Sequence, residues 1–315
     1  MPAKLLKAAF ILDPASQPLI YGPEEQRDIA ELVDLVAPSR LEEVEIILSG
    51  WGAPKMDEAF LARAPKLQAV FYGAGSTRYF TTEAFWERDI VLTSAAAANA
   101  VPVADYTVSV ILLSLKHFWR YAALTRTGEG WGDHKRPIPG IFRRTVGIIS
   151  LGMIGRMVQQ RLRALDLNVI TYDPFANGDS SLEEVFREAD VVSLHTPWMR
   201  ETEGMITGKL LASMKPGATF INTARGAIVN EAELVEVFRQ RPDLTAVLDV
   251  VWPEPPEKDS PLLTLPNVVV TPHIAGSHGS EIQRLGRYMV EELQRYLAGE
   301  PLQWQITRKQ AAMLA

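Results

Sequence analysis

The 315-residue chain contains no cysteine. It therefore has no disulfide framework, no thiolate metal site and no cysteine nucleophile. Only five histidines are present, scattered along the chain, and the acidic residues are not clustered at the spacing of metal ligands. The nucleophile-elbow motif that would begin a Ser-His-Asp triad is missing as well. We expect no metal site and no hydrolytic triad.

The chain also lacks a large excess of charge of either sign. The chain has 32 Lys and Arg against 38 Asp and Glu, a net charge of −6, and no basic run. This composition argues against nucleic acid and acidic membrane surfaces as partners. The apolar run Ala8–Leu12 is too short for a signal sequence. The apolar stretch Val101–Leu115 is interrupted by Asp105, so no membrane span and a cytoplasmic location are expected.

The most informative feature that is present is a βαβ pattern in the middle of the chain. Val146–Ser150 is typical of a buried parallel strand, and Asn168–Tyr172 of a second strand. Between them, Gly152 and Gly155 open an apolar-striped helix, and Asp173 ends the second strand. This acidic residue follows the glycines by about 20 residues, the spacing of a dinucleotide-binding fingerprint.

Each residue of this turn has a physical role in binding a dinucleotide. Gly152 lets the pyrophosphate approach the backbone, and Gly155 lets the helix pack on the strand. The helix N-terminus attracts the phosphates, and Asp173 accepts hydrogen bonds from the ribose hydroxyls. Ser150 replaces the first glycine of the pattern, which predicts a weaker grip on the phosphates. The predicted cofactor residues here are Gly152, Met153, Ile154, Gly155 and Asp173.

The cofactor is predicted to be NAD(H) rather than NADP(H). Asp173 would repel a 2′-phosphate, and the following residues Pro174-Phe-Ala-Asn supply no Arg or Lys to neutralise one.

Strand and helix signals alternate along the first hundred residues and again from Thr145 onward. The last helix, from Ile282 to Leu297, has no strand after it and could return to the first domain. We predict an α/β fold of two domains, in which a Rossmann-type doubly wound parallel sheet is inserted into a smaller flavodoxin-like α/β domain. Residues 1–101 and 280–315 form the predicted substrate-binding domain, and residues 102–279 the NAD-binding domain.

Individual elements follow from the same signals. Helices are predicted at Glu24–Val36, Met56–Arg63 and Thr82–Glu87. Pro102 is placed in the first turn of a long helix, and Thr125–Gly140 in a loop or arm. The predicted strands are Leu5–Leu12, Val44–Leu48, Leu67–Phe71, Ile90–Thr93, Val191–Leu194, Ala218–Asn222, Leu244–Asp249 and Val268–Val270, besides the two of the βαβ pattern.

Three titratable residues follow strand ends in the second half of the chain: Arg225, Glu254 and His273. Ligands of parallel sheets bind beyond the carboxyl ends of the strands, so the three could converge over a nicotinamide. Such a trio suits hydride transfer at a carbonyl that bears a carboxylate. The reaction needs a proton donor and acceptor, a cation for the carboxylate, and an acid that orients the histidine.

With these residues in place, the chain resembles the D-isomer-specific 2-hydroxyacid dehydrogenase family. The resemblance covers nearly the whole chain and is strongest from about 145 to 276. The motifs are specific for the family but nearly silent on the substrate. The matching stretches are Val146–Gly155, Ala189–Pro197, Met214–Gly217, Ile221–Gly226, Leu248–Val250, Pro253–Pro255, Leu265–Val268 and Thr271–Gly276.

The resemblance implies the roles of the trio. His273 would be the general acid in ketone reduction and the base in alcohol oxidation. Glu254 would hydrogen-bond His273 and favour its protonated form, with Glu257 as the fallback acid. Arg225 would hold the substrate carboxylate, and Asp249 would contact the nicotinamide side of the cofactor. His278 is the only competitor to His273, and it comes one helical turn too late.

The resemblance also implies the remaining binding residues. In the first domain, a glycine-rich loop grips the substrate carboxylate through its N–H groups. The helix that begins near Asn99 carries Asp105 and Tyr106 where the family usually has Glu-His, which is a minor departure. The implied substrate residues are Gly73, Ala74, Gly75, Asn99, Arg225 and His273. The implied cofactor residues are Thr107, His195, Thr196, Pro197, Thr223, Ala224, Arg225, Asp249, His273 and Gly276.

The leading hypothesis is an NAD-dependent dehydrogenase of small D-2-hydroxy acids that works as a 2-keto acid reductase, with glyoxylate and hydroxypyruvate as first candidates. Trp51, Tyr72 and Trp131 could narrow its site. The family also implies a homodimer, in which the arm that carries Trp131 forms part of the interface.

Glu254 argues against a formate dehydrogenase, which resembles this chain but has glutamine there. A phosphoglycerate dehydrogenase is expected only as a short form. A dinucleotide-sensing corepressor would need partner grooves and long tails.

Overall fold

The computed structural model describes residues 5–129, 131, 138–176 and 178–313. The chain divides into two compact units, one formed by residues 1–100 and 277–315 and the other by residues 101–276. Helix α5 (Ala96–Ser114) begins in the first unit and continues in the second. Each unit is built around a parallel sheet, and the predicted α/β class is confirmed.

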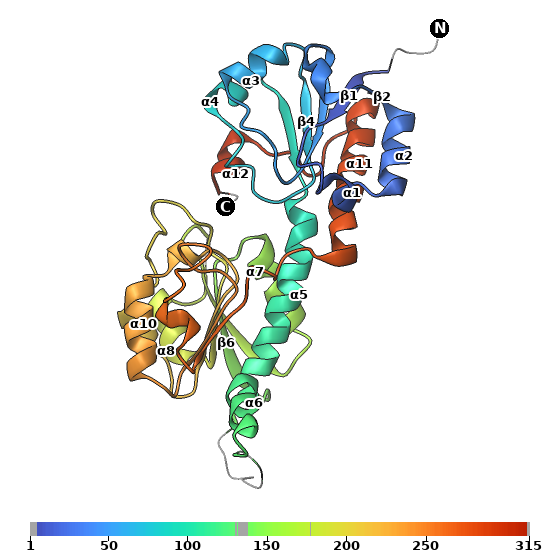
Figure 1. Ribbon diagram of the computed structural model, residues 1–315. Helices are drawn as coiled ribbons and strands as arrows, with labels where there is room; N and C mark the ends of the chain where they lie inside the picture. Colours follow the sequence, from blue (N-terminus) through green and yellow to red (C-terminus); the bar gives the residue numbers. More distant parts are fainter. Residues whose placement is uncertain (1–4, 130, 132–137, 177, 314–315) are drawn as a thin grey trace. The chain divides into compact units, whose positions relative to one another are not determined.

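The sheet of the first unit has the strand order β2-β1-β3-β4-β5, which is the flavodoxin-like order. Alternate residues along its strands enter two apolar clusters, one on each face. Figure 1 shows the red α11 (Ile282–Ala298) beside the blue α1 (Gln17–Ile20) and α2 (Pro23–Leu32), so the end of the chain completes this unit. The strands are Lys7–Phe10, Asp34–Leu35, Ile46–Ser49, Ala69–Tyr72 and Val91–Ser94 for β1 to β5. The other helices are α3 (Glu58–Arg63), α4 (Glu83–Trp86) and α12 (Arg308–Met313).

Two features of the first unit differ from the prediction. The helix expected to reach Val36 ends at Leu32, because Val33 is extended and the next two residues pair with β1 as the short strand β2. The segment after α11 was not expected to pair with a strand. Its Gln305 forms an antiparallel bridge with Thr93 and covers the edge of β5. The fully buried carboxylate of Glu292 fixes that segment by accepting hydrogen bonds from the amides of residues 303 and 304.

Helix α5 starts earlier than predicted, and Pro102 lies inside it rather than in its first turn. Proline has no N–H to donate, so the helix continues without the hydrogen bond that position 102 would form. A helix that was not foreseen, α6 (Phe118–Arg126), extends two residues into the predicted arm Thr125–Gly140. Half of the arm beyond it, residues 130 and 132–137, lies outside the described residues.

Helix α5 is also long and apolar enough to cross a membrane by length and composition alone. Half of that stretch is buried within the protein, and core helices of globular proteins pass the same test.

The second unit has a six-stranded parallel sheet with the order β11-β10-β9-β8-β6-β7. The strand order reverses between β6 and β8, where a doubly wound sheet binds its ligand. Among the described residues the chain passes from β7 to α8 without a further strand outside β7. The strands are β6 (Arg144–Ile149), β7 (Leu167–Tyr172), β8 (Val191–Leu194), β9 (Thr219–Asn222), β10 (Thr245–Leu248) and β11 (Val268–Val270). The helices are α7 (Met153–Leu162), α8 (Leu182–Glu188), α9 (Gly208–Ala212) and α10 (Glu231–Gln240).

Helices cover both faces of this sheet. Apolar residues of α5 and α7 form one cluster with residues such as Ile148 and Ile221, whereas α8, α9 and α10 form the other with Ile149 and Phe220. Adjacent residues of a strand point to opposite faces, so each strand contributes to both clusters.

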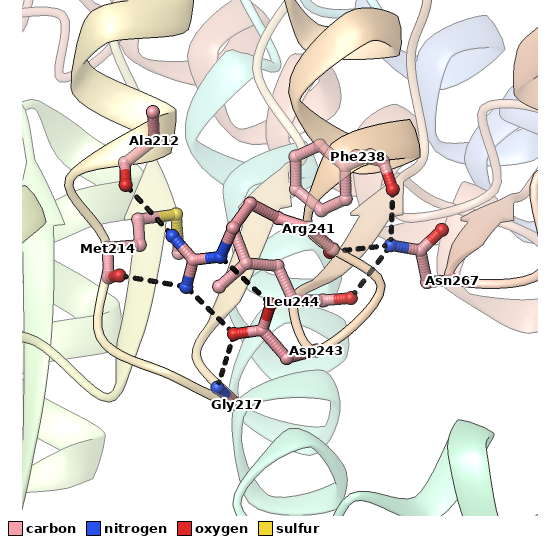
Figure 2. A network of polar contacts seen from close by, with 8 residues as sticks. All are labelled: Ala212, Met214, Gly217, Phe238, Arg241, Asp243, Leu244 and Asn267. Carbon is pink, nitrogen blue, oxygen red and sulfur yellow. Dashed lines mark hydrogen bonds and ion pairs between the residues drawn. The ribbon is translucent and has the colours of Figure 1, made fainter.

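The end of the sheet where β9, β10 and β11 begin is held by polar contacts (Figure 2). The Arg241 guanidinium pairs with Asp243 at 2.7 Å and donates to the carbonyl oxygens of Ala212 and Met214. The Asn267 amide donates to three further carbonyl oxygens, of Phe238, Arg241 and Leu244. The guanidinium lowers the pKa of the Asp243 carboxyl. Asn267 belongs to one of the family motifs, and its role here is to join the end of α10 to the start of β11.

Candidate active site

The second unit brings together the three residues expected to carry the chemistry. Strands β9, β10 and β11 are parallel neighbours, so their carboxyl ends lie at one edge of the sheet. Arg225 follows β9, Glu254 follows β10 and His273 follows β11.

His273 and Glu254 are in direct contact. The Nδ1 atom of His273 lies 2.6 Å from Oε1 of Glu254, and both side chains are partly exposed, at 46% and 37%. The acid in contact is thus Glu254 and not Glu257, whereas His278 belongs to the first unit and begins a short 3₁₀ turn there. With Nδ1 engaged, the Nε2 atom of His273 is the ring nitrogen that can exchange a proton with a substrate.

The backbone of His273 is held in an unusual conformation. Its φ is +55°, in the left-handed region that non-glycine residues rarely adopt. Its amide donates to the carbonyl oxygens of Asp249 and Thr271, each at 2.9 Å. Strain of this kind persists only where the surroundings determine the geometry.

Asp249 supplies most of those surroundings. Its buried carboxylate accepts from Thr271 Oγ1 at 2.6 Å and from the amides of Ile274 and Ala275 at 2.8 and 2.9 Å. The family resemblance implies a contact between Asp249 and the nicotinamide side of a cofactor. In the structure this carboxylate braces the loop on both sides of His273.

Arg225 lies in a turn that Asn222 shapes. The Asn222 side chain accepts from the Ala224 amide at 2.9 Å and donates to the Arg225 carbonyl oxygen at 3.0 Å. The guanidinium donates to the Ala224 carbonyl oxygen at 2.6 Å. Burial lowers the pKa of Arg225, and the negative charge of Glu254 opposes that effect. A largely desolvated cation beside the His–Glu pair is suited to binding an anionic group.

The segment that carries Glu254 is pressed against this turn. A Cβ on Gly226 would lie 2.0 Å from the carbonyl carbon of Val251. One residue further, the Trp252 amide donates to Glu231 at 3.3 Å, and the Trp252 ring lies 4.8 Å from that of Trp198 between centroids. Sequence reasoning missed Asn222, Glu231 and Trp198 as supports, although Asn222 lies inside a family motif.

The glycine turn has the features of a dinucleotide site. A Cβ on Gly152 would meet no atom within 4 Å, so the backbone there is open to a ligand. A Cβ on Gly155 would lie 2.0 Å from the carbonyl oxygen of Ser150, so the helix packs as closely as expected. Ser150, in place of the first glycine, adopts a φ of +75°. Met153 is exposed at the start of α7, and Ile154 contacts the apolar cluster of that face.

Asp173 lies at the end of β7 and bonds to the same turn. Its carboxylate accepts from the Leu151 amide at 2.5 Å, and from the amides of Phe175 and Ala176 at 2.7 and 3.1 Å. The acid therefore holds the glycine turn in addition to its expected contact with a ribose.

The loop after β8 lies next to this turn. Thr196 Oγ1 is 3.1 Å from Ser150 Oγ, and both residues are buried. The ring of His195 is buried with Nε2 at 3.0 Å from Ser193 Oγ, and its Nδ1 has no partner among the described residues. Burial lowers the pKa of His195 to about 4. The Pro197 carbonyl oxygen accepts from Thr202, a support that the sequence did not reveal.

The remaining implied cofactor residues are also in the second unit. Thr107 and Thr223 are buried with their hydroxyl oxygens 3.1 Å apart, which ties α5 to the end of β9. Gly276 is the last residue of this unit. Among the described residues, no three His, Asp or Glu side chains form a group that could hold a metal ion.

The implied substrate residues of the glycine loop belong to the first unit. The amides of Gly73 and Ala74 donate to Ser49 and Tyr72 carbonyl oxygens, each at 2.8 Å. Ser94 Oγ donates to the carbonyl oxygens of Ala74 and Gly75 and so sets the direction of the loop. Of the three amides predicted to grip a carboxylate, those of Gly73 and Ala74 are engaged within the protein.

Asn99 lies beside this loop. Its Oδ1 accepts from the Ser277 amide at 2.9 Å, and its Nδ2 is 3.9 Å from where a Cβ on Gly75 would lie. The amide group of Asn99 is thereby oriented with its nitrogen toward Gly75.

Comparisons with known proteins identify the family. Residues 108–275 match the model of the D-isomer specific 2-hydroxyacid dehydrogenase, NAD binding domain. The chain is 30% identical to the D-3-phosphoglycerate dehydrogenase of Methanocaldococcus jannaschii over 92% of its own length and 57% of that protein. It is 35% identical to the glycerate dehydrogenase of Methylorubrum extorquens over 65% of this chain and 67% of that protein.

Among solved structures, the TT0316 protein of Thermus thermophilus matches 96% of this chain and 100% of its own, with a TM-score of 0.77 and 28% identity. The chain spans about half the length of the curated phosphoglycerate dehydrogenases that it matches. The family model nevertheless covers more than half of the chain, and its matched region contains Arg225, Glu254 and His273. The family predicted from the sequence motifs is confirmed: the chain belongs to the D-isomer-specific 2-hydroxyacid dehydrogenases and carries their NAD-binding domain.

Proposed function

We propose that this protein is an NAD(H)-dependent D-2-hydroxyacid dehydrogenase that reduces a small 2-keto acid. The observation that carries the proposal is the contact of 2.6 Å between His273 Nδ1 and Glu254 Oε1, with the guanidinium of Arg225 close enough for Glu254 to affect its pKa. A proton donor, an acid that orients it and a cation for a carboxylate are the groups that reduction of a 2-keto acid needs.

The residues present fit a dinucleotide. The open backbone at Gly152, the close packing at Gly155 and the amides at the start of α7 make a site for a pyrophosphate. Bound NADH would supply the hydride. Arg225 would hold the substrate carboxylate, and Glu254 would orient the His273 ring so that Nε2 donates a proton to the carbonyl oxygen. In alcohol oxidation the same nitrogen would accept the proton.

Several features support a small substrate with one carboxylate. Arg225 can satisfy one carboxylate of the substrate. A phosphate or a second carboxylate would need additional cations, because a desolvated anion without partners is costly. The glycerate dehydrogenase of M. extorquens is named for a substrate of this size. We therefore propose glyoxylate and hydroxypyruvate as the first candidates.

A second candidate is a phosphoglycerate dehydrogenase, which the names of several relatives favour. The test is a spectrophotometric panel of 2-keto acids with NADH. If 3-phosphohydroxypyruvate or phenylpyruvate gives a kcat/KM at least about tenfold above glyoxylate and hydroxypyruvate, the proposed substrate class is wrong. If the protein reduces none of these 2-keto acids with NADH, a dinucleotide-sensing protein of the corepressor type becomes the better explanation.

We also propose a cytoplasmic homodimer without nucleic acid or membrane partners. Several large apolar side chains near α6 are exposed, including Phe118, Trp131 and Phe142, and Trp131 is 82% exposed. Aromatic residues of this kind are typical of interface cores.

A further inference from the structure

Tyr106 reaches the loop of His273 through two other side chains. Its hydroxyl oxygen lies 3.0 Å from Thr271 Oγ1, and Thr271 Oγ1 lies 2.6 Å from Asp249 Oδ1. Tyr106 is on α5, whereas Thr271 and Asp249 follow β11 and β10, so three segments distant in sequence meet within the second unit. The ring of Tyr106 contacts the apolar cluster of that face, a contact for which phenylalanine would serve as well.

The hydrogen bonds from Tyr106 through Thr271 to Asp249 all point in one direction. A carboxylate can only accept, so the single hydroxyl proton of Thr271 is donated to Asp249. Thr271 Oγ1 must then accept the proton of Tyr106. Burial raises the pKa of Tyr106, which keeps the phenol protonated as this arrangement requires. Hydrogen bonds in such a chain polarise and strengthen one another.

Asp249, the last acceptor of this series of hydrogen bonds, holds the backbone on both sides of His273. Asp249 binds the Thr271 hydroxyl before His273 and the amides of Ile274 and Ala275 after it. The backbone of His273, with φ at +55°, depends on these contacts. Rotation of the Thr271 hydroxyl away from Asp249 would loosen the loop on the side where it meets the catalytic ring.

We propose that Tyr106 is a positioning residue for His273, whose hydroxyl acts through Thr271 and Asp249 to hold the loop 271–275 and the imidazole that it carries. The kinetic part of this inference rests on the proposed function.

The first test needs no enzymatic activity. Amide hydrogen exchange of the segment 271–276 is measured in the wild type, in Tyr106→Phe and in Tyr288→Phe. The last variant is a matched control that removes a phenol hydroxyl in the first unit, where the ring stays stacked on Trp304. Tyr106→Phe should speed exchange at Ile274 and Ala275 about fivefold, as expected for the loss of one neutral hydrogen bond. Unchanged exchange would overturn the proposal.

The second test is a double-mutant cycle with Thr271→Val. This change keeps the shape of the side chain and removes the hydroxyl that links Tyr106 to Asp249. Tyr106→Phe alone should lower kcat about three- to tenfold and leave KM for NADH unchanged. In the Thr271→Val background it should have no further effect, because the connection is already broken. Independent, additive losses would show that the Tyr106 hydroxyl acts by a route other than Thr271 and would overturn the proposal.

The two tests separate this inference from the proposed function. If the wild type reduces no 2-keto acid, the proposed function fails, while hydrogen exchange still decides whether Tyr106 holds the loop. If the wild type is active and Tyr106→Phe alters neither exchange nor kcat, the proposed function stands and the role of Tyr106 is refuted.

Discussion

Gly226 lies against the backbone of Val251 so closely that a Cβ at position 226 would be 2.0 Å from the Val251 carbonyl carbon and 2.2 Å from its oxygen. Backbone atoms cannot move away as a flexible side chain can. We therefore expect Gly226→Ala to push apart the turn of Arg225 and the segment of Glu254. Overpacking costs about 1–3 kcal/mol, so the melting temperature should fall by several degrees and kcat by at least about tenfold. Thermal unfolding and steady-state kinetics measure both.

Gly152→Ala provides the contrast. A Cβ at position 152 would meet no atom within 4 Å, and φ is −68° there, so the folded protein accommodates alanine. The melting temperature should stay within a degree or two of the wild type, whereas the Kd for NADH should rise because the added methyl lies where the pyrophosphate approaches. A large loss of stability with unchanged NADH affinity would contradict this assignment of Gly152.

His273→Ala should lower kcat by about 10²–10⁴, the usual range for removal of a general acid. Glu254→Gln should give a smaller loss, because the amide keeps a partner for Nδ1 but not the negative charge. Glu257→Gln is the matched control, since His273 contacts Glu254. Equal losses in Glu254→Gln and Glu257→Gln would show that the contact in the structure is not the functional one.

Asp173→Ser should narrow the preference for NADH over NADPH, because a 2′-phosphate would no longer meet a carboxylate. The same change removes the acceptor of the Leu151 amide, so KM for NADH should also rise. The measurement is kcat/KM with both cofactors. A wild type that uses NADPH at least as well as NADH would show that the prediction of NAD(H) from the sequence is wrong.

How far the sequence predicts this protein depends on the range of the interactions involved. Strands such as Val191–Leu194 follow from short apolar runs, because a buried parallel strand is apolar on both faces. The trio Arg225, Glu254 and His273 could be proposed because each follows a strand, and adjacent parallel strands place their carboxyl ends together.

Interactions between distant segments could not be predicted in the same way. The helix expected to reach Val36 ends at Leu32 because β1 offers backbone partners to residues 34 and 35, which local propensity does not reveal. The internal contacts of Asp249 depend on where the chain returns after β11. A contact of Asp249 with the nicotinamide was suggested by family resemblance, whereas its three internal donors are visible only in three dimensions.

Because the His195 ring is buried, we expect the free energy of unfolding to depend on pH. Its folded pKa of about 4 is below the ordinary value of 6.5, so the unfolded chain binds a proton at a pH where the folded protein does not. Above pH 6.5 the ring is neutral in both states and adds no pH dependence. As the pH falls from 6.5 to 4, the free energy of unfolding decreases, by about 3 kcal/mol at pH 4. In His195→Gln this component should be absent. Urea unfolding of both proteins at pH 7 and pH 4.5 measures it, and parallel losses would contradict the assignment.

The homodimer is tested by light scattering at micromolar concentration, where we expect twice the mass of 35.0 kDa. Phe142→Glu should shift the protein toward the monomer, because a charged side chain replaces an apolar one that is 64% exposed near α6. Leu263→Glu, at a side chain 50% exposed in the 3₁₀ turn Pro261–Leu263, is the matched control and should leave the mass unchanged. A wild-type mass of one chain would refute the dimer.

The contacts of Arg241 and Asn267 join the elements of the second unit at the end of the sheet where β9, β10 and β11 begin (Figure 2). The groups proposed for chemistry follow the opposite ends of the same strands. Substitutions in the loops beyond those ends leave the contacts of Arg241 and Asn267 in place. Directed evolution of those loops would therefore begin from strands whose opposite ends are already fixed by Arg241 and Asn267.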